Sequence, residues 1–367
     1  MAPLCAVALL CILGVWQCVR ATPASQMDYG GVPLWVNRFL GEPSVMSLKD
    51  RLDPHRYQAN NPESCPHRCY CPIQWPTALY CDHSALTSVP SSPPEDTQYL
   101  FLQSNNITSL PSTVLAKAMD LRWLILDHNQ LQGELLAGAA LQNHIELRYL
   151  FANHNRLSAV PRGLPAGLRQ LRLAHNQISS ISAGTFQGLQ NLTVLLLQGN
   201  RLQTIKPKGF TGLLNLDLLD LGENRFKSVP TYLPPSVQQL YLSGNNFSGL
   251  GESSFAGLER LKYLRLSRCG LQSAGVPPEA FNMSTLVELD LSYNRLATTP
   301  TVPTSLQYLY LEANEIQEFK LSSFCPGEGP LSYSRMRIIR MDGNKMSYSQ
   351  LPLDWVYCLR VLQNIFV

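Results

Sequence analysis

One apolar pattern recurs eleven times after residue 96, and it constrains the fold more than any other feature of the chain. The pattern is Leu-x-x-Leu-x-Leu-x-x-Asn-x-Leu, with clean copies that begin at Leu121, Leu192 and Leu286. No single copy can bury its own leucines, so neighbouring copies must stack into a curved solenoid. Cys81-Asp82-His83-Ser84-Ala85-Leu86 resembles a degenerate twelfth copy. The Asn position is occupied in turn by Asn105, Asn129, Asn155, Asn176, Asn200, Asn224, Asn245, Cys269, Asn294, Asn314 and Asn344.

This pattern is the leucine-rich repeat, so we predict an α/β-type solenoid. Each repeat should add one strand to a curved parallel sheet of about 12 strands on the concave face. The convex side should consist of irregular, 3-10 or polyproline II segments, and both ends should carry disulfide-bonded caps. At about 4.8 Å per strand, the inner face would be on the order of 55 Å long. Such a surface suits an extended or large partner better than a small metabolite.

The chain divides into five predicted segments. Residues 1–21 have the apolar run and the small residues before a cleavage point that are typical of a secretory signal. Residues 22–64 mix Pro, Gly and both charge signs without a period and are predicted to be a disordered arm. Residues 65–96 should form the N-terminal cap with the first repeat, 97–324 the repeats, and 325–367 an oversized loop and the C-terminal cap. No run of 18 apolar residues follows the signal, so we expect a secreted protein without a membrane span.

Of the seven cysteines that follow the predicted signal, six fall into two groups that fit an oxidising compartment. Cys65, Cys69, Cys71 and Cys81 lie in the front cap, and Cys325 and Cys358 lie at the back. Both groups are predicted to form disulfides, although the front four allow three pairings. A zinc knuckle is the alternative for the front group, and we expect no metal or other cofactor. The unpaired Cys269 occupies an Asn position, which favours a buried, inert thiol over a reactive one.

Four Asn-x-Ser/Thr sequons lie in the repeats. Two of them directly follow an inward Asn, and two lie at or just before the start of a strand. Both places should face solvent and leave room for a bulky sugar. We therefore expect N-glycosylation at Asn106, Asn191, Asn246 and Asn282.

The x positions of each strand should face the concave side, because side chains alternate along a strand. Aromatic and Arg residues, which are enriched in binding hot spots, are frequent there, with acidic residues toward the end of the chain. The alternative is a solvated face without a partner. The predicted concave residues are Arg122, Trp123, Arg148, Tyr149, Phe151, Arg169, Arg172, Tyr241, Lys262, Tyr263, Arg265, Glu288, Asp290, Tyr293, Tyr308, Tyr310 and Glu312.

Three histidines share one register position. His128, His154 and His175 each come just before the inward Asn of successive repeats. Their stacking would allow a metal site or a pH-responsive patch, because imidazoles titrate near neutrality. We favour the simpler interpretation that they are exposed turn residues without a shared ligand.

Catalysis and nucleic-acid binding are not indicated. No nucleophile motif, phosphate loop or paired-carboxylate pattern is present, so the chain is not expected to be an enzyme. Lys plus Arg number 29 against 26 Asp plus Glu, which leaves no overall basic excess for nucleic acid.

The cap and the repeat lengths resemble one known family. The spacing Cys65-x3-Cys69-x-Cys71-x9-Cys81, the mixture of short and long repeats and the 30-residue interval before Asn344 resemble the second class of small leucine-rich proteoglycans. The resemblance covers residues 65–367. It implies the disulfides Cys65–Cys71, Cys69–Cys81 and Cys325–Cys358.

The same resemblance implies a function in the extracellular matrix. Members of the family bind fibrillar collagen, regulate fibril assembly, diameter and spacing, and carry keratan sulfate or plain N-glycans. Glu318 and Lys320 resemble the family's collagen-contacting segment, although an ordinary exposed turn around a buried Phe319 fits equally well. On the concave face, Tyr263, Arg265, Glu288 and Asp290 are the candidate collagen contacts.

The N-terminal arm differs from that of some family members, and a second function is compatible with the sequence. Some members carry an acidic, tyrosine-rich sulfated arm, whereas this arm offers only Asp28-Tyr29 and an isolated Tyr57, so tyrosine sulfation is not expected. The alternative function is a secreted module that binds a soluble growth factor or a cell-surface receptor.

Overall fold

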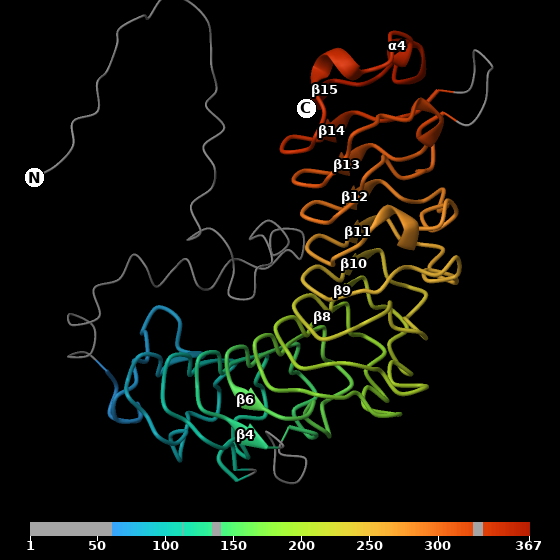
Figure 1. The fold of residues 1–367 in the computed structure, drawn as a ribbon. Coiled ribbons are helices and arrows are strands. Elements are labelled where there is room, and N and C mark those ends of the chain that lie inside the picture. The colour runs from blue at the N-terminus through green and yellow to red at the C-terminus, as the bar shows by residue number, and fades with distance from the viewer. Residues whose placement is uncertain (1–60, 112, 134–140, 326–332) are drawn as a thin grey trace, which may run out of the picture.

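A computed structural model describes residues 61–111, 113–133, 141–325 and 333–367. The predicted signal, almost all of the predicted arm and the tip of the oversized loop lie outside these residues. The described chain winds into a curved solenoid whose strands line the inside of the bend (Figure 1). The repeat pattern therefore predicted the fold class correctly.

The main sheet is parallel, and it has 13 strands, one more than expected. Consecutive strands pair in register without an offset, so that Leu195, for example, lies between Leu171 and Leu219. The additional strand, β15, belongs to the C-terminal cap. In sheet order the strands are β1 (Ala78–Tyr80), β2 (Tyr99–Phe101), β3 (Trp123–Ile125), β5 (Tyr149–Phe151), β7 (Gln170–Arg172), β8 (Val194–Leu196), β9 (Leu218–Asp220), β10 (Gln239–Tyr241), β11 (Tyr263–Arg265), β12 (Glu288–Asp290), β13 (Tyr308–Tyr310), β14 (Ile338–Arg340) and β15 (Asn364–Phe366).

The segments outside the main sheet are short. A two-stranded sheet joins β4 (Gln132–Gly133) to β6 (Arg156–Leu157), just past the exits of β3 and β5. Three 3-10 turns and one helical turn complete the described elements. They are η2 (Ser273–Gly275), η3 (Leu321–Ser323), η4 (Tyr348–Gln350) and α4 (Trp355–Cys358).

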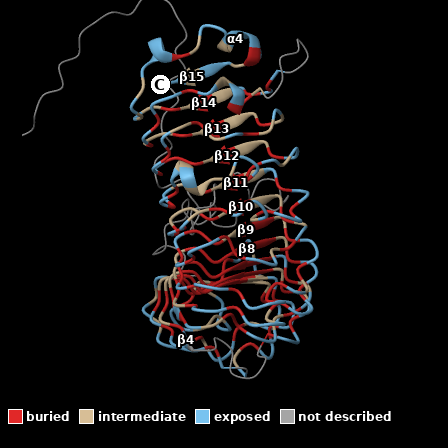
Figure 2. Cartoon of the chain, turned by 45° about the vertical axis from the view of Figure 1, so that its right-hand side comes forward, coloured by how far each residue is buried: buried red, intermediate tan, exposed pale blue. Residues whose placement is uncertain are grey.

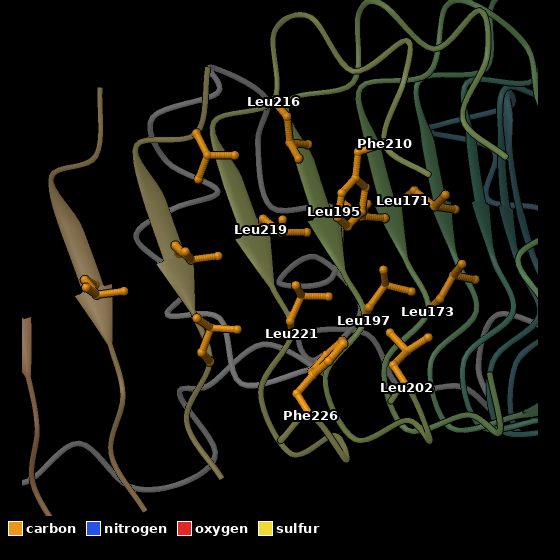
Figure 3. Close-up of a cluster of buried hydrophobic side chains, with 14 of the residues drawn as sticks. Leu171, Leu173, Leu195, Leu197, Leu202, Phe210, Leu216, Leu219, Leu221 and Phe226 are labelled. Carbon is orange, nitrogen blue, oxygen red and sulfur yellow. The ribbon is translucent and has the colours of Figure 1, made fainter. Parts of the chain in front are cut away.

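Leucine forms the core because the middle residue of each strand and the residue just past the strand point inward. Leu195, Leu197 and Leu202 have no exposed surface, and they contact their equivalents in the neighbouring repeats (Figure 3). Phenylalanines of the return segments, such as the stacked pair Phe186 and Phe210, close the convex side. Each fully buried side chain of this size contributes about 2 kcal/mol of transfer free energy.

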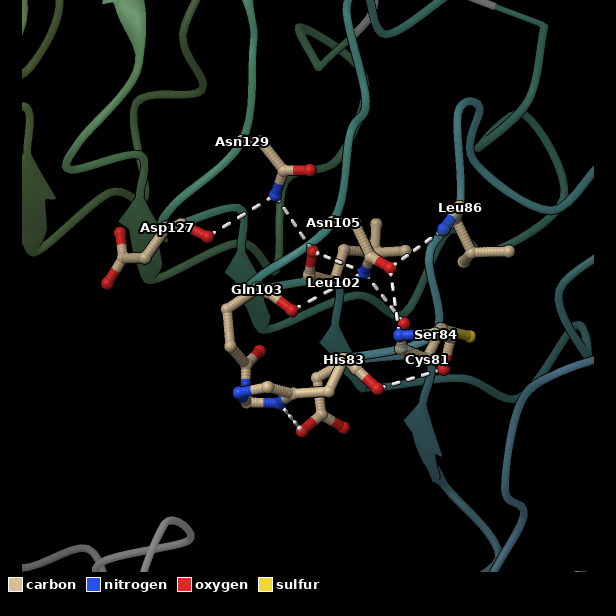
Figure 4. A network of polar contacts seen from close by, with 10 residues as sticks. Cys81, His83, Ser84, Leu86, Leu102, Gln103, Asn105, Asp127 and Asn129 are labelled. Atoms are coloured by element: carbon tan, nitrogen blue, oxygen red, sulfur yellow. Dashed lines mark hydrogen bonds and ion pairs between the residues drawn. The ribbon is translucent and has the colours of Figure 1, made fainter.

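The Asn position ties successive repeats together through the backbone. The side chain of Asn105 accepts hydrogen bonds from the N–H groups of Ser84 and Leu86. Its amide group donates to the carbonyl oxygens of Cys81 and Leu102, and Asn129 repeats the arrangement one turn later (Figure 4). These bonds satisfy buried backbone groups that no strand partner reaches.

Both ends are held by disulfides in the pairing that the resemblance implies. Cys65–Cys71 and Cys69–Cys81 lie beside β1, and Cys325–Cys358 joins the base of the large loop to α4. Tyr70 forms an antiparallel bridge with Tyr80 on the outer edge of β1. This bridge covers an edge that would otherwise expose unpaired backbone groups.

Candidate functional site

The concave face consists of the first and third residue of each strand, and its character changes along the solenoid. At the N-terminal end these residues form an aromatic cluster. Tyr80 stacks on Phe101 with ring centroids 4.5 Å apart, and Trp123 lies 4.2 Å from Tyr149. Phe101 is 1% exposed, and the other clustered residues of the strands are buried or half-buried. Toward the C-terminal end, on β11 to β13, the strands are coloured mostly as intermediate (Figure 2).

The centre of the face is apolar and includes one buried arginine. Val194, Leu196 and Leu218 form a small buried cluster on β8 and β9. The guanidinium carbon of Arg172 lies 4.1 Å from the centroid of the Phe151 ring, and burial lowers the pKa of Arg172 to about 9. Arg172 is therefore part of the packed sheet rather than a free basic contact.

The C-terminal part presents polar side chains that are partly exposed. On β11, β12 and β13 the middle residue is buried, whereas the first and third are half-exposed. The register aligns Tyr263, Glu288 and Tyr308 in one row and Arg265, Asp290 and Tyr310 in the next. We call these six side chains the concave array. Four of the six predicted collagen contacts belong to it.

One ion pair and two hydrogen bonds hold the charged groups of the array in place. Two guanidinium nitrogens of Arg265 donate to one Glu288 oxygen, at 3.2 and 3.1 Å, and the guanidinium lies over the Tyr241 ring at 4.7 Å. The carboxylate of Asp290 accepts hydrogen bonds from the backbone N–H and the hydroxyl of Ser292. These contacts fix the positions of the charged groups before any partner binds, which lowers the ordering cost of an interface.

Burial makes one neighbouring carboxyl easy to protonate. Asp220 on β9 lies in the same row as Arg265, one strand beyond Tyr241. Burial raises the pKa of Asp220 to about 7, although the Gly222 N–H and the Arg265 charge act in the opposite direction. The charge of the Asp220 side chain, which lies beside the array, therefore changes near neutral pH.

The other predicted contacts lie elsewhere. Glu318 and Lys320 come after the exit of β13, where Glu318 bridges to Thr298 and the two side chains form an exposed ion pair at 3.6 Å. Phe319 between them is buried and stacks on Phe324. The structure does not bring this segment to the concave array. Arg148, which was expected on the concave face, donates to the carbonyl oxygen of Ile145 and so turns back toward its own loop.

The three histidines form a stacked column. The rings of His128 and His154 have centroids 4.2 Å apart, and His154 and His175 follow at 4.4 Å. In the part of the chain that the structure describes, no group of three or more His, Cys, Asp or Glu side chains is arranged to hold a metal ion. All three rings are half-buried and stack on one another along successive turns. The interpretation that they share no ligand stays a prediction.

The middle histidine is expected to stay neutral in mild acid. Burial, followed by the positive charges that His128 and His175 would carry, lowers the pKa of His154 to about 4. At pH 5.5 the His154 ring should remain unprotonated, whereas a histidine in a short peptide would be largely charged. NMR titration of the ring protons measures this directly. Replacing both His128 and His175 by Ala should raise the His154 pKa, and an unchanged value in that variant would contradict the assigned cause.

The four sequon asparagines are exposed, as a glycan acceptor requires. Asn106 and Asn246 lie where the chain leaves the sheet, and Asn191 and Asn282 lie where it approaches the next strand. Sugars at these four positions would flank the concave face on both sides without covering it.

Cys269 is the free cysteine of the described chain, and it is fully buried. Its thiol lies 3.3 Å from the carbonyl oxygen of Leu242 and takes over part of the missing Asn's role. Burial raises the pKa of the thiol to about 12, so the reactive thiolate is essentially absent. The side chain is structural.

Comparisons with known proteins decide the family. Residues 166–226 and 236–258 match family models described as leucine-rich repeats. The chain is 42% identical to human lumican over 303 residues, which is 82% of this chain and 89% of lumican. It is 40% identical to chicken lumican over 85% of this chain and 92% of that protein, and 37% identical to zebrafish keratocan over 86% and 92%. The chain belongs to the class II small leucine-rich proteoglycans.

Solved structures agree on the fold. A chain of the octameric complex of Latrophilin 3, Unc5D and FLRT2 superposes with a TM-score of 0.65 at 25% identity, covering 82% of this chain and 83% of that one.

As a class II small leucine-rich proteoglycan, the protein is a component of the extracellular matrix. Within the described residues, no helix has the length and apolarity needed to cross a membrane.

Proposed function

We propose that this proteoglycan binds fibrillar collagen through the concave array and regulates the assembly, diameter and spacing of the fibrils. The observation that carries the proposal is the change in exposure along the sheet. The concave side chains are buried on β1, β5, β7 and β8, whereas those of the array on β11 to β13 are half-exposed. Tyrosine and arginine held in fixed positions are the residue types that dominate protein interfaces.

The mechanism is adhesive and steric. The array is an open, curved surface with two carboxylates, one guanidinium and three phenol rings, which suits the side of an extended protein better than a small ligand. N-glycans at Asn106, Asn191, Asn246 and Asn282, either plain or extended to keratan sulfate, would project from both sides of the bound solenoid. Their bulk would hold neighbouring fibrils apart and limit lateral growth.

Removing the two negative charges of the array should weaken collagen binding about 10-fold at physiological salt. The double substitution Glu288→Gln and Asp290→Asn keeps the shape and a hydrogen-bond acceptor at each position but removes the charges, and a 10-fold loss of affinity corresponds to about 1.4 kcal/mol. The difference from wild type should shrink as salt is added. Co-sedimentation with collagen during fibril assembly, over a range of protein concentrations, gives the affinity.

A matched control separates the site from overall charge. Glu252→Gln with Glu259→Gln removes the same charge from exposed residues outside the sheet, and this variant should bind like wild type. Equal binding by all three proteins would remove the array from the proposal. Wild-type protein that stays in the supernatant would instead favour the soluble-ligand function.

A further inference from the structure

The outer side of the central repeats has an uncompensated positive charge. From residue 147 to residue 216 the chain contains no Asp or Glu, and after Lys227 no charged residue occurs before Glu252. Asp217 and Asp220 lie at the two ends of β9 in the concave sheet, where Asp217 accepts a hydrogen bond from the Gln239 side chain and Asp220 is half-buried. Along the chain, the nearest exposed carboxylate to this stretch is Glu223, at the turn that leaves β9.

Five cations lie together on this side, and we call them the basic surface: Arg201, Lys206, Lys208, Arg225 and Lys227. Arg201 and Arg225 directly precede Leu202 and Phe226, whose side chains point into the core in Figure 3. The arginine side chains therefore point away from the core, and both are exposed. Parallel coils place them one strand spacing apart, about 4.8 Å, because the Arg225 N–H donates to the carbonyl oxygen of Leu202.

The three lysines extend the surface toward the convex side. The Lys206 N–H bonds to the Ile181 carbonyl oxygen, and the Lys227 carbonyl oxygen accepts from Ser248, so these residues lie on coils that stack directly on their neighbours. Lys208 has a left-handed backbone with φ 62° and is exposed. Among the described residues, none of the five cations forms a salt bridge, whereas Arg265, Lys320, Arg340 and Lys345 all do.

We propose that the basic surface binds a sulfated glycosaminoglycan chain of another matrix molecule. Closely spaced, unpaired cations on an open surface attract a linear polyanion through many weak contacts, and they do not require a pocket. The protein is extracellular, where sulfated polysaccharides are the abundant linear polyanions. The basic surface lies on the outer side of the solenoid, so the binding is independent of the concave array and goes beyond collagen binding.

The predicted glycan at Asn246 sets one boundary of the surface. Asn246 follows its inward Asn as Arg201 and Arg225 follow theirs, and its N–H donates to the carbonyl oxygen of Phe226. A sugar on Asn246 would therefore stand in the column next to Arg225. If that sugar carries sulfate, it competes with an added chain for the same cations.

Retention on immobilised heparin or chondroitin sulfate tests the proposal with the full secreted protein. The triple variant Arg201→Gln, Arg225→Gln and Lys227→Gln should bind about 10- to 100-fold more weakly near 0.15 M NaCl and elute earlier in a salt gradient. The control variant removes the exposed Arg122, Arg260 and Arg295 and should elute with wild type. Because all six side chains are exposed, equal thermal unfolding temperatures should verify that every variant is folded.

Several outcomes would overturn the proposal. These are co-elution of the triple variant with wild type, an equal loss in the control variant, and unchanged retention on a desulfated column. Retention of the protein on duplex DNA as strong as on the sulfated chains would show non-selective polyanion binding and would also overturn it. Asn246→Gln separates the two sources of sulfate: tighter binding of added chains by this variant identifies the protein's own glycan as a competitor.

Discussion

Replacing Asn200 by Ala should lower the free energy of unfolding by about 3 to 5 kcal/mol, although the side chain is small and uncharged. Its oxygen accepts from the Ile178 N–H at 3.0 Å, and its amide donates to the carbonyl oxygens of Leu173 and Leu197 at 2.9 Å each. Alanine would leave these backbone groups buried without partners, at about 1 to 3 kcal/mol for each group. Urea unfolding followed by circular dichroism gives the change.

The control for this prediction lies three residues away. Gln203 is exposed, and Gln203→Ala should change stability by less than about 0.5 kcal/mol. A loss below 1 kcal/mol for Asn200→Ala would mean that water reaches the freed backbone groups. It would also mean that the Asn column contributes little to holding the repeats together.

Cys269 is a natural replacement in this column. At Cys269 the thiol lies close to the Leu242 carbonyl oxygen, but it cannot accept as an amide oxygen does. The Phe247 N–H donates instead to the backbone carbonyl oxygen of Cys269, at 3.0 Å. In the other repeats the corresponding N–H bonds to the Asn side chain, as Leu202 does to Asn224. The backbone therefore adjusts to compensate for one lost acceptor.

The Asn column also shows why the fold could be predicted from the sequence. Inward leucine and inward asparagine recur at fixed offsets. In every repeat the leucine fills the core and the asparagine bonds to the backbone of the neighbouring repeat, so their spacing marks each turn of the solenoid. The last strand departs from this rule. Around β15 only the apolar half of the pattern is present, as Leu362-x-x-Ile365-x-Val367, without the inward Asn that marked the other repeats.

The concave face was less predictable, because its chemistry depends on neighbours rather than on register. Arg172 and Arg265 occupy the same strand position and looked equivalent. In the structure Arg172 is buried over Phe151, whereas Arg265 is partly exposed and pairs with Glu288. The sequence placed both side chains on the correct face, but their packing partners decide which of them can reach a ligand. Glu318 and Lys320 were predicted as collagen contacts by resemblance alone, as a segment separate from the concave face, and the structure places them past the exit of β13.

Replacing both Cys325 and Cys358 by Ala should lower the free energy of unfolding by about 3 kcal/mol and loosen the C-terminal cap selectively. The bridge spans 33 residues, and the chain-entropy model assigns about 3 to 4 kcal/mol to a closed loop of this length. Next to the bridge, the Ser334 N–H donates to the Cys358 carbonyl oxygen, so the disulfide also holds the segment just before β14 against α4. Chemical denaturation of the secreted variant gives the total loss.

Hydrogen exchange shows where that loss occurs. The Met341 N–H bonds to Phe366 and the Asn364 N–H to Arg337, so both report on the pairing of β14 with β15. Without the disulfide these two amides should exchange faster, whereas the Leu197 N–H, which bonds to Asp220 in the centre of the sheet, should not change. In a solenoid each repeat contacts only its neighbours, so an opened end need not weaken the middle. Equal acceleration at all three amides would show instead that the sheet unfolds as a single cooperative unit.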